Sequence, residues 1–283
     1  MTTLIFGQQD DPQVLAVADA LGDDNSTIID DDTLLHDITV HYENGTAVCE
    51  LDGNLLQPSS VYWRTLNYYP FESQYDQTGH NVYAYIDLFL KCFEGARMVN
   101  PLRPFIDHFI KYRQFDFVQS KTQVSTPATI ITMNGEQAMA FLEKHGCAIL
   151  KPVAGGDYAH LVYPDDDWTG FEFEQPVIFQ EYIEGTDVRT YVVGDNVYSA
   201  DIITDEVDFR TGDHAIVPTK LPKGYKKAAK DITQSLGYEW TAIDWINRNG
   251  ELFFLEANFS PMFCGFEKAT GFPIASDLAE ILK

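Results

Sequence analysis

The chain has 283 residues, of which 45% are hydrophobic and 13% are aromatic. This content is enough to bury a sizeable core, and at about 100–200 residues per domain it predicts about two domains and excludes a disordered chain. Asp and Glu (43) outnumber Lys and Arg (19), so the formal net charge is −24. Because binding to a phosphate backbone requires clustered Lys and Arg, this balance argues against nucleic acid as the main partner. Solubility and adaptation to salt would each explain the acidity, and a basic peptide partner stays open.

The cysteines and the N-terminus bear on the compartment. The four cysteines are far apart, without a C-x-x-C pair or a His at zinc-finger spacing: Cys49, Cys92, Cys147 and Cys264. They predict free thiols in a reducing compartment rather than a disulfide framework or a structural zinc site. The start "MTTLIFGQQDD" has a short apolar run and no basic residues, which is typical of a first strand and not of a secretion signal. No stretch is long enough to cross a membrane, so we expect a cytoplasmic protein without a membrane partner.

The first 100 residues predict an α/β domain. A strand at 2–7, a helix with apolar positions at helical spacing over 11–24 and a strand at 26–31 give a β-α-β opening. The segment 38–53 predicts a hairpin that turns at Asn44-Gly45. A strand over "SSVYWRTL" and a helix near "NVYAYIDLFLKCFEGA" follow, and "MVNPLRP" places a domain boundary near residue 100.

The remaining residues predict a mixture of strands and helices, so the fold class is α/β (α+β). A helix from Pro104 runs through 105–119, and Asn134 with Gln137 forms a capping-box-like start to a helix over 135–146. Strands are predicted at 128–132, 147–153, 176–183, 187–194, 197–204 and in the hairpin 241–261, and further helices near 224–236 and 274–282.

The hairpin segment "TAIDWINRNGELFFLEANFSP" contains three oxygen-bearing side chains within apolar runs. Side chains at i and i+2 of a strand share a face, so Glu256 and Asn258 point the same way. If Asp244 joins them, two carboxylates and an amide on one half-buried face would repel and lose hydration unless a cation lay between them, and hard oxygen ligands suit magnesium bridging phosphates. The sequence therefore predicts a magnesium site, the alternative being that each residue caps a turn or reaches solvent at a strand end.

The turn decides the face of Asp244. A two-residue Asn249-Gly250 turn would pair Asp244 with Leu255 and send it to the opposite face from Glu256. A three-residue loop over 248–250 would instead pair Asp244 with Phe254, bring the three oxygens together and give Gly250 a left-handed conformation. We expect the three-residue loop.

Lys151 and the glycines after it suggest a phosphate site. Lys151 ends the apolar run "CAIL", and a lysine is rarely buried without a negative partner, so a phosphate is a natural candidate. The adjacent Gly155 and Gly156 in "VAGGDYAH" would let backbone amides approach phosphate oxygens. The alternatives are a lysine that reaches solvent at the strand end and an ordinary Gly-Gly turn.

A polar hinge and two arginines are the remaining candidate site residues. In "VIFQEYIEGTDVRTYVV" a buried strand passes through a hinge at 181–184 whose backbone groups could read an adenine edge, with Glu184 placed for ribose hydroxyls. Arg189 beside Tyr191, and Arg210 in "DEVDFRTG", could each clamp phosphoryl or carboxylate oxygens. A plain strand connection and surface ion pairs are the alternatives.

In order along the chain, Lys111 on a helix after "NP", Lys151 in "ILKPV", "QEYIEGTDVR", "AIDWI" and "FLEANFSP" resemble the ATP-grasp superfamily. The pattern covers about residues 100–283 and looks closest to RimK-like glutamate ligases and to ATP-grasp maturases of ribosomal peptides. "SPMFCGFEKATGFPIA" is similar to the RimK-like ending, whereas "SVYWR", "VDFR" and Leu221-Pro222 are similar to the peptide maturases. The stretch "AGGDYAH" is shorter and less glycine-rich than the usual RimK-like phosphate flap.

The resemblance implies an ATP-grasp fold with an N-terminal α/β pre-ATP-grasp domain at 1–100, a small subdomain at 101–179 and a C-terminal subdomain with the metal site at 180–283. It implies that Lys111 and Lys151 bind ATP phosphates, that Glu181, Tyr182 and Ile183 contact adenine largely through backbone groups, and that Glu184 holds the ribose. Asp244, Glu256 and Asn258 would hold two Mg²⁺ ions, with Mn²⁺ as a substitute, and Arg210 would stabilise the transferred phosphate.

The expected function is that of an ATP-dependent carboxylate-amine ligase, which activates a carboxylate as an acyl phosphate for attack by an amine. Two versions stay open: addition of an amino acid to a peptide or protein, and crosslinking of precursor side chains through ester or amide bonds. From another class, a non-catalytic ATP-binding or peptide-docking module is the alternative. The partners are thus a peptide or protein carboxylate, or an amino acid, and the sequence is compatible with a homo-oligomer.

Overall fold

The computed structural model describes residues 2–22, 25–64, 77–101, 111–153, 158–166, 168 and 172–283. The chain forms two compact units, one of Met1–Pro101 with Met262–Cys264 and Pro273–Lys283, and the other of Leu102–Pro261 with Gly265–Phe272. The chain therefore returns to its first unit near the C-terminus, which the predicted boundaries near residues 100 and 179 did not anticipate. None of the described helices combines the length and apolar character needed to traverse a bilayer.

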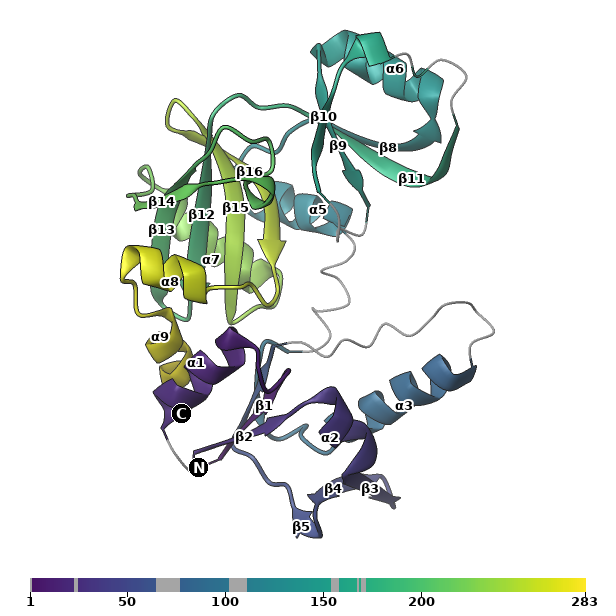
Figure 1. Ribbon diagram of the computed structural model, residues 1–283, viewed down its shortest axis with the longest axis vertical. Helices are drawn as coiled ribbons and strands as arrows, with labels where there is room; N and C mark the ends of the chain where they lie inside the picture. The colour runs from purple at the N-terminus through teal and green to yellow at the C-terminus, as the bar shows by residue number, and fades with distance from the viewer. Residues whose placement is uncertain are drawn as a thin grey trace. The chain divides into compact units, whose positions relative to one another are not determined.

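The first unit contains a parallel sheet with strand order β2-β1-β6-β7, of which Figure 1 labels β1 and β2. Its strands are β1 (Thr3–Phe6), β2 (Ser26–Ile29), β6 (Ser60–Trp63) and β7 (Arg97–Val99). β1 pairs in parallel with both β2 and β6, so the predicted β-α-β opening is confirmed. Every residue of β1 and β6 is buried, as expected for a parallel sheet that is covered on both faces.

The first unit also contains helices, one of which belongs to the returning C-terminal segment. The helices are α1 (Pro12–Leu21), α2 (Asp31–His36), α3 (Gln77–Lys91) and α9 (Ile274–Leu282). α9 contacts α1 and β6, and the Ser60 hydroxyl donates a hydrogen bond to the Leu282 carbonyl at 2.6 Å. The buried Gln13 Oε1 accepts hydrogen bonds from the backbone N–H groups of Phe263 and Cys264 at 2.9 and 2.8 Å. These contacts tie the C-terminal segment to the first unit.

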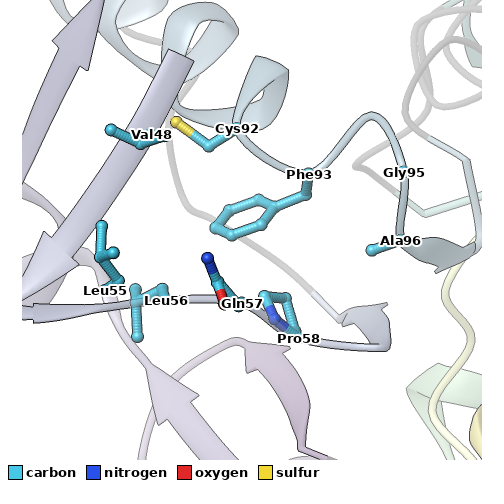
Figure 2. A pocket seen from close by; sticks show the side chains of 9 residues that line it. All are labelled: Val48, Leu55, Leu56, Gln57, Pro58, Cys92, Phe93, Gly95 and Ala96. Carbon is cyan, nitrogen blue, oxygen red and sulfur yellow. The ribbon is translucent and has the colours of Figure 1, made fainter. Parts of the chain in front are cut away.

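An antiparallel sheet lies beside α3 in the same unit. It is formed by β3 (Ile38–Glu43), β4 (Thr46–Leu51) and β5 (Asn54–Leu55). Asn44 and Gly45 have φ values of 51° and 83°, which confirms the predicted two-residue turn. A pocket of about 240 Å³ opens between this sheet and the end of α3, lined by Val48, Leu55, Gln57, Cys92 and Phe93 among others (Figure 2).

The second unit begins with a four-stranded antiparallel sheet of order β10-β9-β11-β8. Its strands are β8 (Thr129–Asn134), β9 (Ala148–Pro152), β10 (His160–Val162) and β11 (Glu172–Glu181). One face packs on α6 (Gly135–His145), where Phe141 and Leu142 meet Phe179 in a buried cluster. The predicted cap is confirmed, because the Asn134 side chain accepts a hydrogen bond from the Gln137 N–H at 3.0 Å. Since neighbouring strand residues face opposite ways, Lys151 and Gln180 point away from α6.

A five-stranded antiparallel sheet of order β14-β13-β12-β15-β16 forms the rest of the unit. Its strands are β12 (Thr186–Val193), β13 (Asn196–Ile203), β14 (Ala215–Pro218), β15 (Trp240–Arg248) and β16 (Glu251–Asn258). The helices beside it are α5 (Lys111–Lys121), α7 (Tyr225–Ser235) and α8 (Cys264–Thr270). Ring contacts place α7 on the Trp245 face (Tyr225–Trp245, 6.2 Å between centroids) and α8 on the Tyr191 face (Tyr191–Phe266, 4.6 Å). Asp244 adjoins Trp245 on β15 and therefore lies on the face opposite α7.

Candidate active site

The β15–β16 hairpin brings the three oxygen-bearing side chains together. Asp244 lies directly opposite Glu256 in the strand pairing. The Asn258 side-chain amide donates a hydrogen bond from Nδ2 to Asp244 Oδ2 at 2.9 Å. All three residues are partly buried, so the hairpin presents two carboxylates and an amide on one half-buried face.

The turn and the strand pairing that produce this common face differ from the prediction. The turn is a two-residue Asn249-Gly250 turn with φ values of 56° and 90°, and Arg248 pairs with Glu251. The predicted three-residue loop is therefore wrong. The pairing then shifts between Trp245, opposite Phe254, and Asp244, opposite Glu256, so that Leu255 is an extra residue in β16. A β-bulge inserts one unpaired residue in this way, and this bulge turns Asp244 to the side of Glu256.

Two cations neutralise the carboxylates of this face. Lys111, at the start of α5, places Nζ 2.8 Å from Glu256 Oε2, and the side chain of Lys111 is only 10% exposed. Arg189 on β12, which pairs with Asp244 across the sheet, places Nη1 3.5 Å from Asp244 Oδ1. Burial and the nearby Glu256 raise the pKa of Asp244 to about 6, while Arg189 and the Asn258 amide act in the opposite direction.

Lys151 is held by a buried glutamine on the neighbouring strand. Its Nζ donates a hydrogen bond to Gln180 Oε1 at 2.9 Å, and Gln180 Nε2 donates to the Thr129 hydroxyl at 3.1 Å. Burial lowers the pKa of Lys151, and the electrostatic influence of Glu256, Lys111 and Asp244 reaches it as well. The ammonium of Lys151 therefore belongs to the same charged environment as the hairpin face.

The predicted hinge follows β11. The Glu181 side chain is occupied, since its Oε2 accepts a hydrogen bond from the Ala128 N–H at 3.1 Å and its own N–H donates to the Ala128 carbonyl at 2.8 Å. Ile183 is buried, whereas Tyr182 and Glu184 are exposed. Tyr182 to Glu184 form no regular secondary structure, so their backbone groups are not used by a strand ladder. The side chain of Glu181 thus stabilises the hinge itself.

The two arginines have different surroundings. The Arg189 guanidinium lies over the rings of Tyr191 and Phe209, at 5.6 and 5.9 Å from their centroids, and among the described residues its buried Nε has no hydrogen-bond partner. Arg210, in the short 3₁₀ helix η2 (Phe209–Thr211), donates from Nε to Asp208 Oδ1 at 2.8 Å, and its Nη2 bonds Asp208 Oδ2. The Arg210 side chain is 50% exposed. Arg189 is thus enclosed, whereas Arg210 is half-exposed and is held in place by the Asp208 carboxylate.

The glycine pair Gly155 and Gly156 lies outside the described residues, so the structure does not place it. The segment just after it is placed. The Ala159 N–H donates a hydrogen bond to Asp208 Oδ2 at 3.1 Å, and the Tyr158 ring lies 5.2 Å from the Arg210 guanidinium. The residues that follow the glycines therefore contact the Asp208–Arg210 pair.

Three site residues were missed by sequence reasoning: Gln180, Asp187 and Asp208. Burial and the nearby Asp244 and Asp208 raise the pKa of Asp187 to about 7, which places its carboxyl group in the same acidic surroundings. Asp187 could have been found by strand parity, because it stands two residues before Arg189 on β12. Gln180 carried a signal too, as a polar residue inside the apolar run "VIFQ".

The donor set on the hairpin fits divalent cations. Carboxylate and amide oxygens are the ligands that Mg²⁺ prefers, and they repel one another on a half-buried face without a positive partner. The candidate ligands are Asp244, Glu256 and the Asn258 amide, which the hairpin brings together. Among the described residues no group of three His, Cys, Asp or Glu side chains is placed to hold a metal ion. The adjoining ammonium groups of Lys111 and Lys151 add the charge that phosphate oxygens require.

Known protein sequences resemble part of the chain. Residues 111–282 match the family model of the RimK-like ATP-grasp domain. A protein of Histophilus somni strain 2336 named "Probable alpha-L-glutamate ligase" is 26% identical over 173 residues, a match that covers 57% of this chain and 52% of that protein. The "Ribosomal protein bS6--L-glutamate ligase" of Escherichia coli O81 strain ED1a is 34% identical over 110 residues, which covers 36% of each. Against the first of these relatives, the chain spans about half the length.

Solved structures resemble it over almost its whole length. The ATP-grasp ligase PsnB, complexed with a phosphomimetic variant of minimal precursor, Mg and ADP, superposes with a TM-score of 0.84 at 26% identity, covering 99% of this chain and 97% of that one. The macrocyclase MdnC of Microcystis aeruginosa MRC, bound with precursor peptide MdnA, has a TM-score of 0.80 at 21% identity and covers 100% and 99%. The ATP-grasp fold expected from the sequence is thereby confirmed.

Proposed function

The chain belongs to the RimK-like ATP-grasp family, and from this premise we propose that it is an ATP-dependent ligase that activates a carboxylate as an acyl phosphate. The observation that carries the proposal is the hairpin face, where Asp244 and Glu256 lie opposite each other with Lys111 and Arg189 as their counterions. Such a face, with Lys151 in its electrostatic environment, fits a triphosphate and its divalent cations. A protein that only senses ATP would need fewer ligands.

The nucleotide would bind in the space between the two sheets of the second unit. We assign Lys111 and Lys151, with backbone amides at Gly155 and Gly156, to its phosphates. Glu181, Tyr182 and Ile183 would contact adenine through backbone groups, and Glu184 would bind the ribose. The engaged side chain of Glu181 supports a backbone role for this residue. In terms of domains, residues 1–100 would be the pre-ATP-grasp domain, 101–179 the small subdomain and 180–283 the subdomain with the metal site.

Asp244, Glu256 and Asn258 would hold two Mg²⁺ ions, which Mn²⁺ can replace. Bound there, the ions would neutralise negative charge on the phosphates. The protein's own share of the work is positioning and electrostatics. Arg189, enclosed by Tyr191 and Phe209, would orient an anionic group, and Arg210, fixed on Asp208, would stabilise the transferred phosphoryl group.

The proposed reaction has two steps. A substrate carboxylate oxygen attacks the γ-phosphorus of ATP, the bond from that phosphorus to the β,γ-bridging oxygen breaks, and ADP leaves. An amine then attacks the acyl carbon of the acyl phosphate, inorganic phosphate leaves, and the amine loses a proton as the amide forms. No nucleophilic side chain of the protein is needed, because the acyl phosphate is the activated species.

The substrate is proposed to be a peptide or protein, with two versions of the acceptor. The relatives named as glutamate ligases support addition of an amino acid, but their matches cover 57% or less of this chain. The similarity to PsnB, described with its minimal precursor, extends over 99% of this chain. This full-length match favours the second version, in which the carboxylate and the attacking amine or hydroxyl belong to one precursor peptide. Because ATP would be the co-substrate, we place the protein in the cytoplasm.

The test is ADP release by the purified protein with ATP, Mg²⁺ and candidate peptides, followed by mass spectrometry of the peptides. Loss of water identifies crosslinking, whereas added mass of an amino-acid residue identifies ligation. Glu256→Ala and Asn258→Ala are expected to lower ADP release by about 100-fold or more. Glu143→Ala, at an exposed position on α6, serves as the control and is expected to keep wild-type activity. Full activity in the Glu256→Ala and Asn258→Ala proteins would remove the catalytic assignment.

A further inference from the structure

Lysines are concentrated in one short segment of this acidic chain. Of the 19 Lys and Arg residues, five fall between residues 220 and 230, in a protein of net charge −24. We call this group the lysine surface, formed by Lys220, Lys223, Lys226, Lys227 and Lys230. All but Lys230 are exposed. The segment spans most of the β14–α7 connection and the first half of α7.

Ion pairs within the protein account for only two of the five charges. Lys227 pairs with Asp231, and Lys230 places Nζ 2.8 Å from Asp195 Oδ1. In the described part of the chain, Lys220, Lys223 and Lys226 form no ion pair. These three ammonium groups therefore present their charge to solvent.

Helix stability does not explain the lysines either. α7 begins after Gly224, which provides no side-chain cap, and its first turn contains no acidic residue. Lys226 and Lys227 occupy that first turn, where the helix macrodipole favours negative charge and opposes positive charge. The segment thus places lysines where they are unfavourable for the isolated helix.

α7, which carries three of the five lysines, packs away from the candidate metal ligands. α7 packs on the face of the large sheet that carries Trp245, through the contact between Tyr225 and Trp245. Asp244 lies on the opposite face of the same strand. Lys226, Lys227 and Lys230, which α7 carries, therefore belong to the layer on the face away from Asp244.

We propose that the lysine surface binds an acidic segment of the peptide substrate, outside the residues that are joined. The proposal rests on the proposed function, in which the substrate presents carboxylates. Such a peptide meets repulsion from most of a surface with net charge −24. At physiological ionic strength charges act over about 8 Å, so the three lysines without an ion pair set the local charge of this segment despite the net charge.

The residue type favours carboxylates on a flexible peptide. The cluster contains lysine only, whose flexible stem and compact ammonium suit a run of carboxylates without fixed geometry, whereas arginine would be expected for planar bidentate recognition. A long polyanion such as RNA would extend beyond the segment onto the acidic remainder of the surface. A short acidic peptide fits within it.

The test uses the full-length protein and a defined probe. Fluorescence anisotropy at low ionic strength measures the affinity of a labelled twelve-residue peptide with six Glu residues, beside its Gln counterpart and a single-stranded oligonucleotide of equal charge. The test variant is Lys223→Glu with Lys226→Glu. The matched control is Lys144→Glu with Lys268→Glu, which changes the net charge equally at exposed lysines on α6 and α8.

The Glu peptide is expected to bind the wild type and the control variant, with affinity lower by about tenfold in the test variant and little difference among the proteins at high salt. The Gln peptide should not bind. The melting temperature of the test variant should stay equal or rise, because Glu at position 226 suits the helix N-terminus, so weaker binding cannot come from unfolding. Equal losses in both variants, no binding of the Glu peptide, or tighter binding of the oligonucleotide than of the peptide would each overturn the proposal. ADP release is measured separately, so the peptide-binding result can be interpreted even if the protein shows no ligase activity.

Discussion

Gly185 lies between the hinge and β12, and replacing it by alanine tests whether the hinge position matters for nucleotide use. A Cβ at this position would lie 2.5 Å from the Asn247 carbonyl oxygen and 2.6 Å from Ile246 Cγ2. Ordinary van der Waals contact begins at 3.4 Å, so the hinge must move by about 0.9 Å. Asn247 cannot yield easily, because it pairs with Thr186 in the sheet and its Oδ1 accepts a hydrogen bond from the Gly250 N–H.

Overpacking of this kind costs about 1–3 kcal/mol of unfolding free energy. The hinge is assigned to adenine and ribose and not to the transferred phosphoryl group, so its displacement should weaken nucleotide binding more than it slows the chemical step. We therefore expect Gly185→Ala to lower the urea midpoint and to raise KM for ATP in the ADP-release assay more than it lowers kcat. The control is Gly265→Ala, whose Cβ would have nothing within 4 Å. A Gly185→Ala protein with the stability and KM of the wild type would refute the account of the hinge.

Two further predictions concern side chains that the sequence did not single out. Gln180→Leu removes the acceptor for Lys151 Nζ at 2.9 Å and leaves this ammonium without its partner, so KM for ATP should rise by about tenfold; an unchanged KM in the ADP-release assay would separate Gln180 from phosphate binding. The second concerns pH, because the pKa values of Asp187 and Asp244 are raised to about 7 and about 6. In the metal-free protein these groups hold protons that the unfolded chain has lost, Asp244 between about pH 4 and 6 and Asp187 between about pH 4 and 7, so the unfolding free energy should fall as pH rises through these ranges. Asp187→Asn should reduce this slope and add about 1–2 kcal/mol at pH 8 but little at pH 5, as measured by urea unfolding at both pH values; equal slopes in variant and wild type would contradict the assignment.

Features governed by local physics were predictable from the sequence. The Asn44-Gly45 turn needs only two residues that tolerate positive φ, and the Asn134 cap needs only the three residues that follow it. Alternation along β16 likewise gave the shared face of Glu256 and Asn258.

Features that depend on distant partners were not predictable in the same way. The bulge at Leu255 arises from pairing with β15, and no residue in the hairpin sequence distinguishes it from an unbroken ladder. The same holds for α9, which contacts α1 and β6 of the first unit after a long excursion of the chain. Gln180 becomes meaningful only when Lys151 is known to lie on the neighbouring strand.

The ion pairs of the hairpin face bear on how such a site can be stable before substrates arrive. Burying two carboxylates side by side is costly unless each has a counterion, and Lys111 and Arg189 meet this need from α5 and β12. The Arg189–Asp244 separation of 3.5 Å is longer than the roughly 2.7–2.9 Å of a strong charge-assisted hydrogen bond, so this pair is held by opposite charge rather than by a close hydrogen bond. On the proposed function, divalent cations would replace these counterions and the freed lysine and arginine would face the phosphates and the substrate carboxylate. Each charge would keep an opposite partner throughout, which is why the same side chains can stabilise the fold and serve the reaction.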